Sequence, residues 1–450
     1  MSRVTLLFAL LCCAACGGGL VDHDGVDVAS LNQLTCTTPQ QVCPGVPTCV
    51  SLDTDPSHCG SCANVCVATQ HATATCVART CGFTCDSGFF RCASGSTCCT
   101  ATALAAGGDT SCAVVDGTVQ CWGANDSGQL GFSPADAMWS SKPVDVPGIS
   151  AASAVAVGLR HACAIVGVNG DVWCWGLNDS GQLADVTGNG PGKVTGVTGA
   201  TALALGDRHS CALTGTGTNA TMNCWGADDV GQLGRGTPSA TPRLPGAVAG
   251  ISSVTSISAG TAFSCAVGSS GGPPNLYCWG DGHLGQFGND PAPNSATPVQ
   301  VSGVSNASTV ACGDSHACAI GSDFWCWGAD ASGQVGDGKL APTAKVSGPG
   351  VASTVAVAAG SAHTCAASIS GALFCWGANE SGQLGTPTLD PTRPTAVSSV
   401  SSIQRVALGA RHSCAQDASG AVYCWGKNSS GQVGAPIGGP ILTPRLIDGR

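Results

Sequence analysis

The tripeptide Cys-Trp-Gly occurs seven times in this chain, and no other feature of the sequence restricts the fold as strongly. Its tryptophans stand 48 to 54 residues apart, at positions 122, 175, 225, 279, 327, 376 and 425. A short apolar run such as 155–164 precedes each copy, and a Gly-rich turn such as 124–131 follows most copies. Short apolar runs between such turns are typical of buried strands. Self-similarity with this period therefore predicts a repeat protein built from small β-sheets.

One copy reads Gly-x-x-His-x-x-Ala, a hairpin, and then Trp-Gly-x-Asn-x-x-Gly-Gln-Leu-Gly. This combination resembles the repeat of the regulator of chromosome condensation family, and the resemblance covers about residues 101–450. It implies an all-β fold, a seven-bladed β-propeller with four-stranded blades, in which circular closure protects the strand edges. The first copy, at Ala101, lacks the Pro-containing strand that precedes the others, and residues 443–447 have this pattern with no repeat after them. We therefore expect the C-terminal strand 443–447 to complete the first blade and close the ring.

Fourteen of the 30 cysteines form seven pairs, with a sequence separation of 8 to 13 residues, on the two sides of the hairpin in each copy. Directly opposed hairpin residues lie within disulfide range, so we expect one disulfide in each blade. A zinc site made by His161, Cys163 and Cys174 is the alternative. Thr110 and Phe263 replace the histidine in two copies that keep both cysteines, which favours disulfides and no metal. The expected pairs are Cys112 with Cys121, Cys163 with Cys174, Cys211 with Cys224, Cys265 with Cys278, Cys318 with Cys326, Cys365 with Cys375, and Cys414 with Cys424.

The other recurrent side chains of the repeat are expected to be structural. The ring nitrogens of the histidines should bond backbone groups, and each repeated tryptophan, on the opposite face from its cysteine, should pack between blades. The recurrent histidines are His161, His209, His316, His363 and His412. Cys312 has no partner in the series and is expected to be a buried core thiol, with a reactive thiol as the alternative.

Residues 1–15 read as a signal peptide, because Arg3 precedes an apolar run from Val4 to Leu11 that is too short to span a bilayer. The stretch before Cys16 resembles a bacterial lipoprotein processing site, which implies that Cys16 is lipidated and that residues 16–35 form a flexible tether. Cys13 stands where that family usually has Leu, so ordinary cleavage and release is the alternative. Gly17 follows Cys16 in place of the Asp of inner-membrane lipoproteins, and the resemblance therefore implies the outer membrane or cell surface.

Residues 36–100 contain twelve cysteines and too little apolar material to fold without covalent links. In an exported chain this even number favours six disulfides, whose connectivity the sequence leaves open. A zinc site around His58, Cys59 and Cys62 is the alternative. The phrase 55–62 resembles cysteine-rich modules of myxobacterial surface proteins.

Nothing in the sequence predicts catalytic residues, a cofactor or a metal. The string 268–272 matches a nucleophile elbow but lies in a Gly-Pro loop, and Asp207 and Asp314 occur within the structural Gly-x-x-His phrase. The formal net charge of -10 makes nucleic acid a poor partner.

Binding is expected in the connections that differ between copies, because loops on a rigid scaffold carry recognition. The longest connection, 132–142, contains Trp139, which either contacts a partner or folds back onto its blade. Arg160, Arg208 and Arg411, next to the structural histidines, are the other candidates, with the loops 185–192 and 289–294.

We therefore predict a monomeric, non-catalytic protein that binds another protein or a cell-envelope glycan, anchored in the membrane only through lipid or else secreted. The resemblance supports protein binding, because family members catalyse nucleotide exchange on a small GTPase or inhibit a β-lactamase through a propeller face. The alternatives are an inhibitor of a secreted or periplasmic enzyme, a purely structural protein of the outer layer, and a polysaccharide-active enzyme. That enzyme requires carboxylates that converge at one end of the central channel.

Overall fold

The computed structural model describes residues 36–447 except 93–94, 189, 289–290, 342, 348–349 and 388–389. The expectations for the leader, the lipidated Cys16 and the tether lie outside the described residues. The chain divides into two compact units, Met1–Thr84 and Cys85–Arg450. The sequence analysis assigned residues 85–99 to the cysteine-rich module. The boundary falls instead between Thr84 and Cys85, so these residues belong to the same unit as the repeats.

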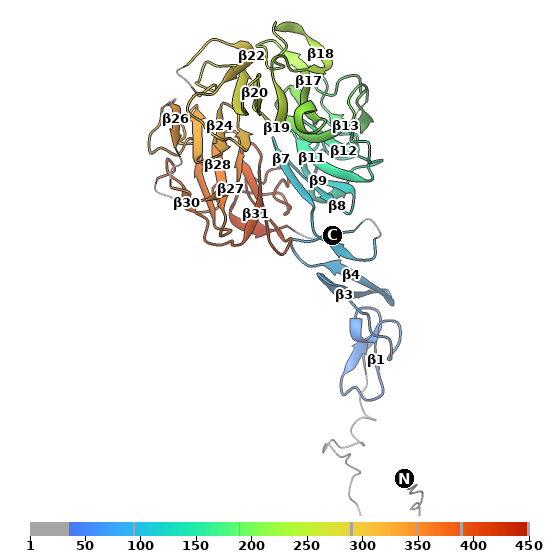
Figure 1. Ribbon diagram of the computed structural model, residues 1–450. Helices are drawn as coiled ribbons and strands as arrows, with labels where there is room; N and C mark the ends of the chain where they lie inside the picture. The colour runs from blue at the N-terminus through green and yellow to red at the C-terminus, as the bar shows by residue number, and fades with distance from the viewer. Residues whose placement is uncertain are drawn as a thin grey trace, which may run out of the picture. The chain divides into compact units, whose positions relative to one another are not determined.

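The second unit contains seven four-stranded antiparallel sheets, each formed by four consecutive strands of the chain. They are the blades of the expected seven-bladed propeller, and their inner strands surround a central axis (Figure 1). The innermost strands of blades 1 to 7 are β7 (Ala103–Gly107), β11 (Ala152–Val157), β15 (Ala200–Leu205), β19 (Ser252–Ala259), β23 (Thr309–Cys312), β27 (Thr354–Ala359) and β31 (Ile403–Leu408). The second strands are β8 (Thr110–Val115), β12 (His161–Val166), β16 (His209–Thr214), β20 (Phe263–Ser269), β24 (His316–Ile320), β28 (His363–Ser368) and β32 (His412–Asp417).

The third strands carry the Cys-Trp-Gly phrase, and the outer strands lie at the rim of the ring. The third strands are β9 (Thr118–Ala124), β13 (Asp171–Gly176), β17 (Thr221–Asp228), β21 (Asn275–Gly280), β25 (Phe324–Gly328), β29 (Leu373–Gly377) and β33 (Val422–Gly426). The outer strands are β10 (Trp139–Asp145), β14 (Gly192–Lys193), β18 (Ser239–Ala247), β22 (Ser295–Gln300), β26 (Thr343–Ser347), β30 (Thr395–Ala396) and β34 (Ile441–Leu446). A short 3-10 helix, η3 (Gly217–Asn219), lies in the hairpin of blade 3.

Second and third strands are apolar without alternation because blades stack on both of their faces. Every residue of β8 is buried, for example. In each blade the two cysteines stand directly opposite each other, as Cys163 and Cys174 do, and a disulfide joins them. Their Cα atoms are 4.0 to 4.2 Å apart in all seven blades, the close spacing of a non-hydrogen-bonded pair.

Each disulfide packs against the tryptophan of the next blade. Cys163 and Cys174 of blade 2 share a buried cluster with Trp225 of blade 3, and Cys414 and Cys424 of blade 7 share one with Trp122 of blade 1. All seven tryptophans of the repeated phrase are fully buried. The same two side-chain types therefore form the apolar core of every interface between blades.

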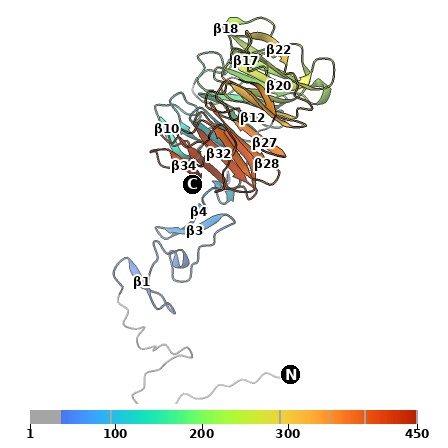
Figure 2. The same cartoon turned by 90° about the vertical axis from the view of Figure 1, so that its left-hand side faces the viewer.

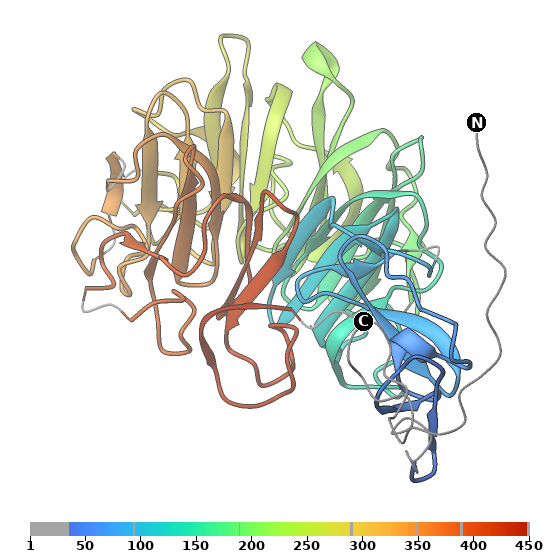
Figure 3. The ribbon, with the colours of Figure 1, turned by 90° about the horizontal axis from the view of Figure 1, so that it is seen from below.

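The ring closes differently from the sequence-based expectation. The C-terminal strand β34 pairs with β33 and completes the seventh blade, whereas the first blade takes all four strands, β7 to β10, from its own copy. The prediction that residues 443–447 belong to the first blade is therefore wrong. Blades 1 and 7 instead pack directly on each other through β7 and β31, and Figure 3 shows the last blade beside the first. Their outer strands β10 and β34 both lie at the edge of the ring in Figure 2.

Residues 85–99 reinforce this closure. Two disulfides, Cys85–Cys98 and Cys92–Cys99, and the strands β5 (Phe90–Arg91) and β6 (Cys98–Cys99) hold the segment together. Gly88 accepts a hydrogen bond from the Val422 amide and donates one to the Ile447 carbonyl, both in blade 7. Phe90 is buried with its ring centroid 6.0 Å from that of Trp122 in blade 1. We call residues 85–99 the clasp, because they contact both the first and the last blade.

The first unit contains little regular structure. Its elements are β1 (Gln40–Val42), β2 (Cys49–Ser51), the 3-10 helix η2 (Pro56–His58), β3 (Ala72–Val77) and β4 (Thr80–Cys85). Its disulfides are Cys36–Cys49, Cys43–Cys62, Cys59–Cys76 and Cys66–Cys81. The core consists largely of these sulfurs, as expected for so small a unit.

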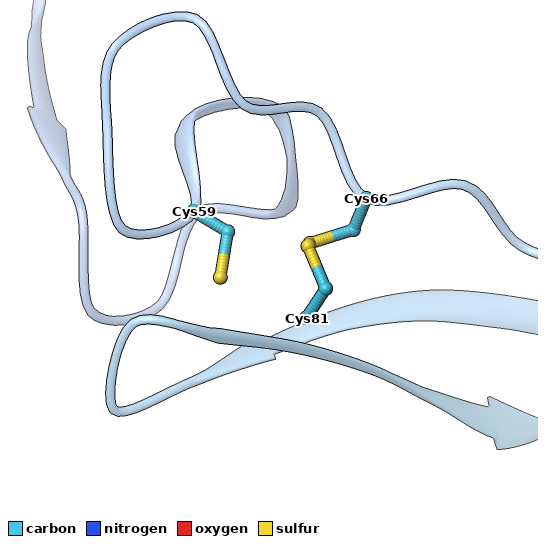
Figure 4. Close-up of side chains that lie close together, drawn as sticks. All are labelled: Cys59, Cys66 and Cys81. Carbon is cyan, nitrogen blue, oxygen red and sulfur yellow. A yellow bond between two sulfur atoms is a disulfide. The ribbon is translucent and has the colours of Figure 1, made fainter.

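The sulfurs of Cys59, Cys66 and Cys81 lie close together, in an arrangement that resembles a metal site (Figure 4). Cys66 is bonded to Cys81, however, and Cys59 to Cys76, so none of the three sulfurs is a thiolate that could bind zinc. The imidazole of His58 lies 3.0 Å from the carboxylate of Asp55.

Candidate binding face

One face of the ring carries both recurrent turns of the repeat. In blade 1, the turn between β7 and β8 contains Asp109, whose carbonyl accepts the amide of Ala124 at the end of β9. The long connection from β9 to β10 begins there, so the Gly-x-x-His turns and the turns after Cys-Trp-Gly lie at the same end of the blades. We call this side of the ring the turn face.

The glycine of each Gly-x-x-His turn has two neighbours that exclude any larger residue. A Cβ atom at Gly206 would overlap the imidazole of His209 in its own turn and the carbonyl oxygen of Gly260 in the next blade. The same two obstacles, a ring three residues on and a carbonyl of the next blade, surround Gly158, Gly313, Gly360 and Gly409. The glycines therefore form a tight backbone ring around the channel.

Each histidine links its blade to the next through a hydroxyl group. His161 Nε2 lies 2.8 Å from Ser210 Oγ, and this hydroxyl donates to the carbonyl of Gln182, 2.8 Å away. Because the hydroxyl hydrogen is used on the carbonyl, the histidine must donate from Nε2. The other links are His209 to Ser264, His316 to Thr364, His363 to Ser413 and His412 to Ser111. The expected backbone partners of the ring nitrogens are therefore wrong, because the partner is a side chain of the neighbouring blade.

Each of the two copies without histidine is followed by a copy without the hydroxyl. Thr110 in blade 1 is followed by Ala162 in blade 2, and Phe263 in blade 4 is followed by Ala317 in blade 5. A hydroxyl without the histidine would lose one buried partner, so both residues change together. The histidine–hydroxyl links are thus absent at two interfaces, between blades 1 and 2 and between blades 4 and 5.

The mouth of the channel on the turn face is a cavity of about 90 Å³. Asp207, Thr261 and Asp314 from blades 3, 4 and 5 are part of its lining. Loss of solvation in the channel, with the charge of Asp314, raises the pKa of Asp207 to about 6. Two carboxylates therefore do converge at one end of the channel. The cavity is nevertheless far below the roughly 300 Å³ of a typical small-molecule site, so it has too little room for a sugar ring.

Cys312 also lines this cavity, at the end of β23, and is largely buried. Burial raises the pKa of its thiol to about 12, so it is not a thiolate at neutral pH.

A larger groove of about 470 Å³ lies on the turn face between blades 1 and 2. Asp126 at its edge forms an ion pair with Arg160, with 3.4 Å between Oδ2 and Nη1. The neighbouring Asn125 donates its amide to the carbonyl of Met138, directly before Trp139. The groove is lined by Asp126, Ser127 and Pro134 of blade 1 and by Gly176, Leu177, Asn178, Val186, Thr187 and Gly188 of blade 2.

The candidate contact residues occupy three positions on this face. Trp139, expected in a loop, is the first residue of β10 and is 43% exposed, and Met138 before it is 56% exposed. Arg208 pairs with Asp229 at 2.9 Å, as Arg160 does with Asp126. Arg411 is exposed, and among the residues that the structure describes it makes no ion pair.

The structure places Arg160 at the groove through its ion pair with Asp126, Trp139 at the start of the outer strand of blade 1, and Arg208 and Arg411 on blades 3 and 7. The expected loops 132–142 and 185–192 supply Pro134, Val186, Thr187 and Gly188 to the lining, whereas the sequence analysis did not single out Asp126 or Leu177. Asp126 and Leu177 stand in the repeated turn phrase, where their positions look structural. Pro134 was an available sign of the groove, because it lies in the longest connection, 132–142.

Comparisons with known proteins agree with this architecture. A yeast RCC1 (Prp20) structure, solved bound to Kap60, aligns with 73% of this chain and 83% of its own, at 22% identity and a TM-score of 0.64. A second structure of Prp20p, from Saccharomyces cerevisiae, aligns with 73% and 85% at 22% identity and a TM-score of 0.62. Human WBSCR16 aligns with 68% and 84% at 22% identity and a TM-score of 0.59. At these identities the likeness establishes the fold.

The family itself is shown by the sequence profiles. The RCC1-like domain profile matches residues 189–449, and profiles of the regulator of chromosome condensation (RCC1) repeat match residues 116–165 and 152–182. The first of these matches alone covers more than half of the 450 residues. The chain therefore belongs to the RCC1-like family of seven-bladed β-propellers.

Proposed function

We propose that this protein is an exported, non-catalytic binding protein, and that it binds another protein in the groove between blades 1 and 2. The size of the groove carries the proposal, because about 470 Å³ accommodates a side chain or a short loop of a partner. Arg160, of a residue type that is enriched at interfaces, pairs with Asp126 in the groove lining, and the exposed Trp139 belongs to the same blade as Asp126. Yeast RCC1, one of the similar structures, was solved bound to Kap60, which is an instance of protein binding on the same fold.

The exported location is supported by chemistry that is independent of the groove. Thirteen disulfides join cysteines among the described residues, and such bonds persist in oxidising compartments. In the part of the chain that the structure covers, no helix has the length and apolarity to cross a bilayer. We propose that a lipid on Cys16 holds the protein at the outer membrane or cell surface.

A capture experiment tests the groove. The purified full chain, immobilised, is incubated with envelope extract of its native cells, and bound proteins are identified by mass spectrometry. A groove variant carrying Trp139→Ala and Arg160→Ala should lose the partner. The matched control is Ile369→Ala, because Ile369 is 77% exposed in a hairpin on the opposite face. Equal capture by all three proteins excludes the groove, and retention of envelope glycan in place of protein identifies the other expected class of partner.

A second candidate function, polysaccharide cleavage, is favoured by the convergence of Asp207 and Asp314 at the channel mouth. Paired carboxylates are the usual catalytic groups of glycosidases. The small cavity argues against it. Incubation of the full chain with envelope polysaccharide, beside an Asp207→Asn and Asp314→Asn variant, decides the point, because only an enzyme would release reducing ends in a way that the substitutions abolish.

A further inference from the structure

In six of the seven copies the side chain of the third residue after the repeated tryptophan holds the following turn in place, and Gly282 occupies this position in the fourth copy. This residue is asparagine in four copies, at positions 125, 178, 379 and 428. Asn125 Oδ1 accepts the amide of Leu130, and its Nδ2 donates to the carbonyl of Phe132, seven residues on. Asn379 makes the same two bonds, to the Leu384 amide and the Thr386 carbonyl. In these two copies the side chain is therefore an acceptor on one side and a donor on the other.

In blade 5 this residue is Asp330, which has no donor to offer when it is ionised. Asp330 is fully buried, and its Oδ1 accepts the Val335 amide at 2.8 Å, as in the asparagine copies. Its Oδ2 has no hydrogen-bond partner among the described residues. The residue seven positions on is Asp337, whose side chain is 6% exposed and whose Oδ2 also has no hydrogen-bond partner there. In blade 5, two carboxylate oxygens without hydrogen-bond partners thus replace the side-chain amide that donates to a carbonyl in the asparagine copies.

Blade 3 shows how the same substitution is compensated elsewhere. Asp228 occupies the equivalent position, and its buried Oδ2 lies 3.0 Å from Arg243 Nε. Seven residues after Asp228 stands Arg235, a second positive charge close to this carboxylate.

The cations near the blade 5 pair are engaged differently. Lys339 has a side chain that is 71% exposed, and its Nζ lies 3.5 Å from Asp337 Oδ2. Arg393 reaches the backbone at Gly338, but its ion pair is with Asp390, at 3.5 Å. No described ion pair therefore joins a cation to Asp330, and a solvated ammonium alone does not balance two buried carboxylates.

We propose that Asp330 and Asp337 form the core of a calcium site that fixes the outer turn of blade 5. Calcium takes oxygen ligands, and it tolerates the irregular geometry that two carboxylates and a turn carbonyl provide. The carbonyl that receives the amide in the asparagine copies belongs here to Asp337 itself. A divalent ion would supply the positive charge that Arg243 and Arg235 supply in blade 3. Two carboxylates and few further ligands indicate weak binding, on the order of 10⁻⁴ to 10⁻³ M, as in other extracellular modules.

A proton is the competitor of the metal ion at this position. Burial, with the adjacent charge of Asp337, raises the pKa of Asp330 to about 7, although the backbone amides of Val335 and Ala341 act in the opposite direction. A proton shared between the two carboxyl groups would also satisfy both oxygens. A calcium ion and a shared proton predict opposite responses to pH. Calcium binding strengthens as pH rises through 7, whereas a shared proton is lost over the same range.

The experiment measures calcium binding and thermal stability of the full chain after treatment with a chelating resin. Titration calorimetry with calcium chloride at pH 7.5 should show one site in this affinity range, and a calcium concentration well above it should raise the melting temperature of the propeller. Asp330→Asn restores the asparagine of four other copies, so it should fold, and it should lose both the binding and the calcium-dependent shift. Asp228→Asn is the matched control in blade 3, and its response to calcium should equal that of the unaltered protein.

Two results overturn the proposal. One is a calcium response that Asp330→Asn and Asp337→Asn leave unchanged, which places the ion elsewhere. The other is the absence of any response in the unaltered protein, together with a gain in stability on acidification from about pH 8 to 6 that Asp330→Asn removes. That second result identifies the shared proton.

Discussion

The five buried histidines are held in one neutral form by their neighbours. Each donates from Nε2 to a hydroxyl of the next blade, which leaves Nδ1 as the bare nitrogen, and Nδ1 has no hydrogen-bond partner among the described residues in any of the five. Burial lowers the pKa of His161 and His363 to about 3 and that of His209, His316 and His412 to about 4. A proton on Nδ1 would be buried without an acceptor, which explains why the pKa values of these histidines are lowered.

These lowered pKa values predict that the propeller loses stability in mild acid. In the unfolded chain each histidine takes up a proton near its ordinary pKa of 6.5, whereas in the folded chain it does so only near 3 or 4. The free energy of unfolding should therefore fall as pH drops from about 6.5 toward 4. The raised pKa values of Asp207, Asp228, Asp314 and Asp330 oppose this trend, but the pKa values of three other aspartates of the propeller are lowered and act in the same direction as the five histidines. Urea midpoints at about pH 7.5, 5.5 and 4.5 check the prediction, and a midpoint that is higher at the most acidic pH contradicts it.

The natural Phe263 and Ala317 pair supplies a design for removing one of these links. His161→Phe together with Ser210→Ala should be tolerated, with a loss of about 1 kcal/mol or less, because it copies an interface that already exists in blade 4. Ser210→Ala alone should cost about 1–3 kcal/mol, because it leaves the imidazole Nε2–H buried without an acceptor. Chemical denaturation of the three proteins measures the difference. If the double variant is less stable than Ser210→Ala, the coupling between the two positions is wrong.

At this scale the sequence predicted which residues are structural but not which residues they contact. The recurrence of His and Trp marked them as parts of the blade, and the close match between copies made the cysteine pairs predictable. The partner hydroxyl was not predictable from one copy because it belongs to the following copy. Only a comparison of each copy with its successor relates Thr110 to Ala162 and Phe263 to Ala317.

At the scale of the elements, a disulfide and a tryptophan from adjacent blades form each interface, so removing a disulfide should affect more than one blade. Cys211→Ala with Cys224→Ala should lower the propeller's stability by about 3 kcal/mol from chain entropy, and further because the sulfurs pack against Trp279. Cys36→Ala with Cys49→Ala is a control with the same sequence separation of 13 residues, but in the cysteine-rich unit. Calorimetry should show the propeller transition lowered only in the first variant.

The clasp predicts a second effect at this scale. Phe90→Ala should destabilise the propeller by about 3–5 kcal/mol, because Phe90 is 1% exposed and packs on Trp122. Amide hydrogen exchange should rise first in β7 and β31, the strands through which blades 1 and 7 pack on each other. Val168→Ala, at a fully exposed position, serves as the control. Exchange that rises equally in all blades would show that the clasp has no special role in closing the ring.

The closure was the element-scale feature that the sequence pattern did not predict correctly. The Pro-containing strand was expected to begin each copy, whereas it ends each copy at the outer rim. Proline was the available signal, because it lacks an amide donor and is tolerated mainly at sheet edges. Pro143, Pro298 and Pro444 all lie in outer strands. Residues 443–447 therefore had to lie outside β33 of their own copy.

For the whole molecule, the seven copies followed from repetition and the seven-bladed propeller from the resemblance of each copy to a known repeat, whereas the binding groove followed from neither. A groove depends on how two neighbouring turns leave space between them, and no single copy contains that information. The proposed lipid anchor on Cys16 is likewise a separate matter from the fold. Cys16→Ser should move the protein from the membrane fraction to the soluble fraction without changing its disulfides, and fractionation followed by immunoblotting measures this. A protein that stays in the membrane fraction contradicts the lipid anchor.

The uneven distribution of the histidine links divides the ring into two arcs, one of blades 2 to 4 and one of blades 5, 6, 7 and 1. Within an arc, a buried hydrogen bond between a histidine and a hydroxyl links every pair of neighbouring blades. Between the arcs this hydrogen bond is missing. The hydrogen bond from the tryptophan ring to a carbonyl of the preceding blade remains, as between Trp175 Nε1 and the Gln129 carbonyl. The groove opens at one of these two joints. A partner that wedges the first two blades apart therefore meets less resistance at the place where it would insert than it would within either arc.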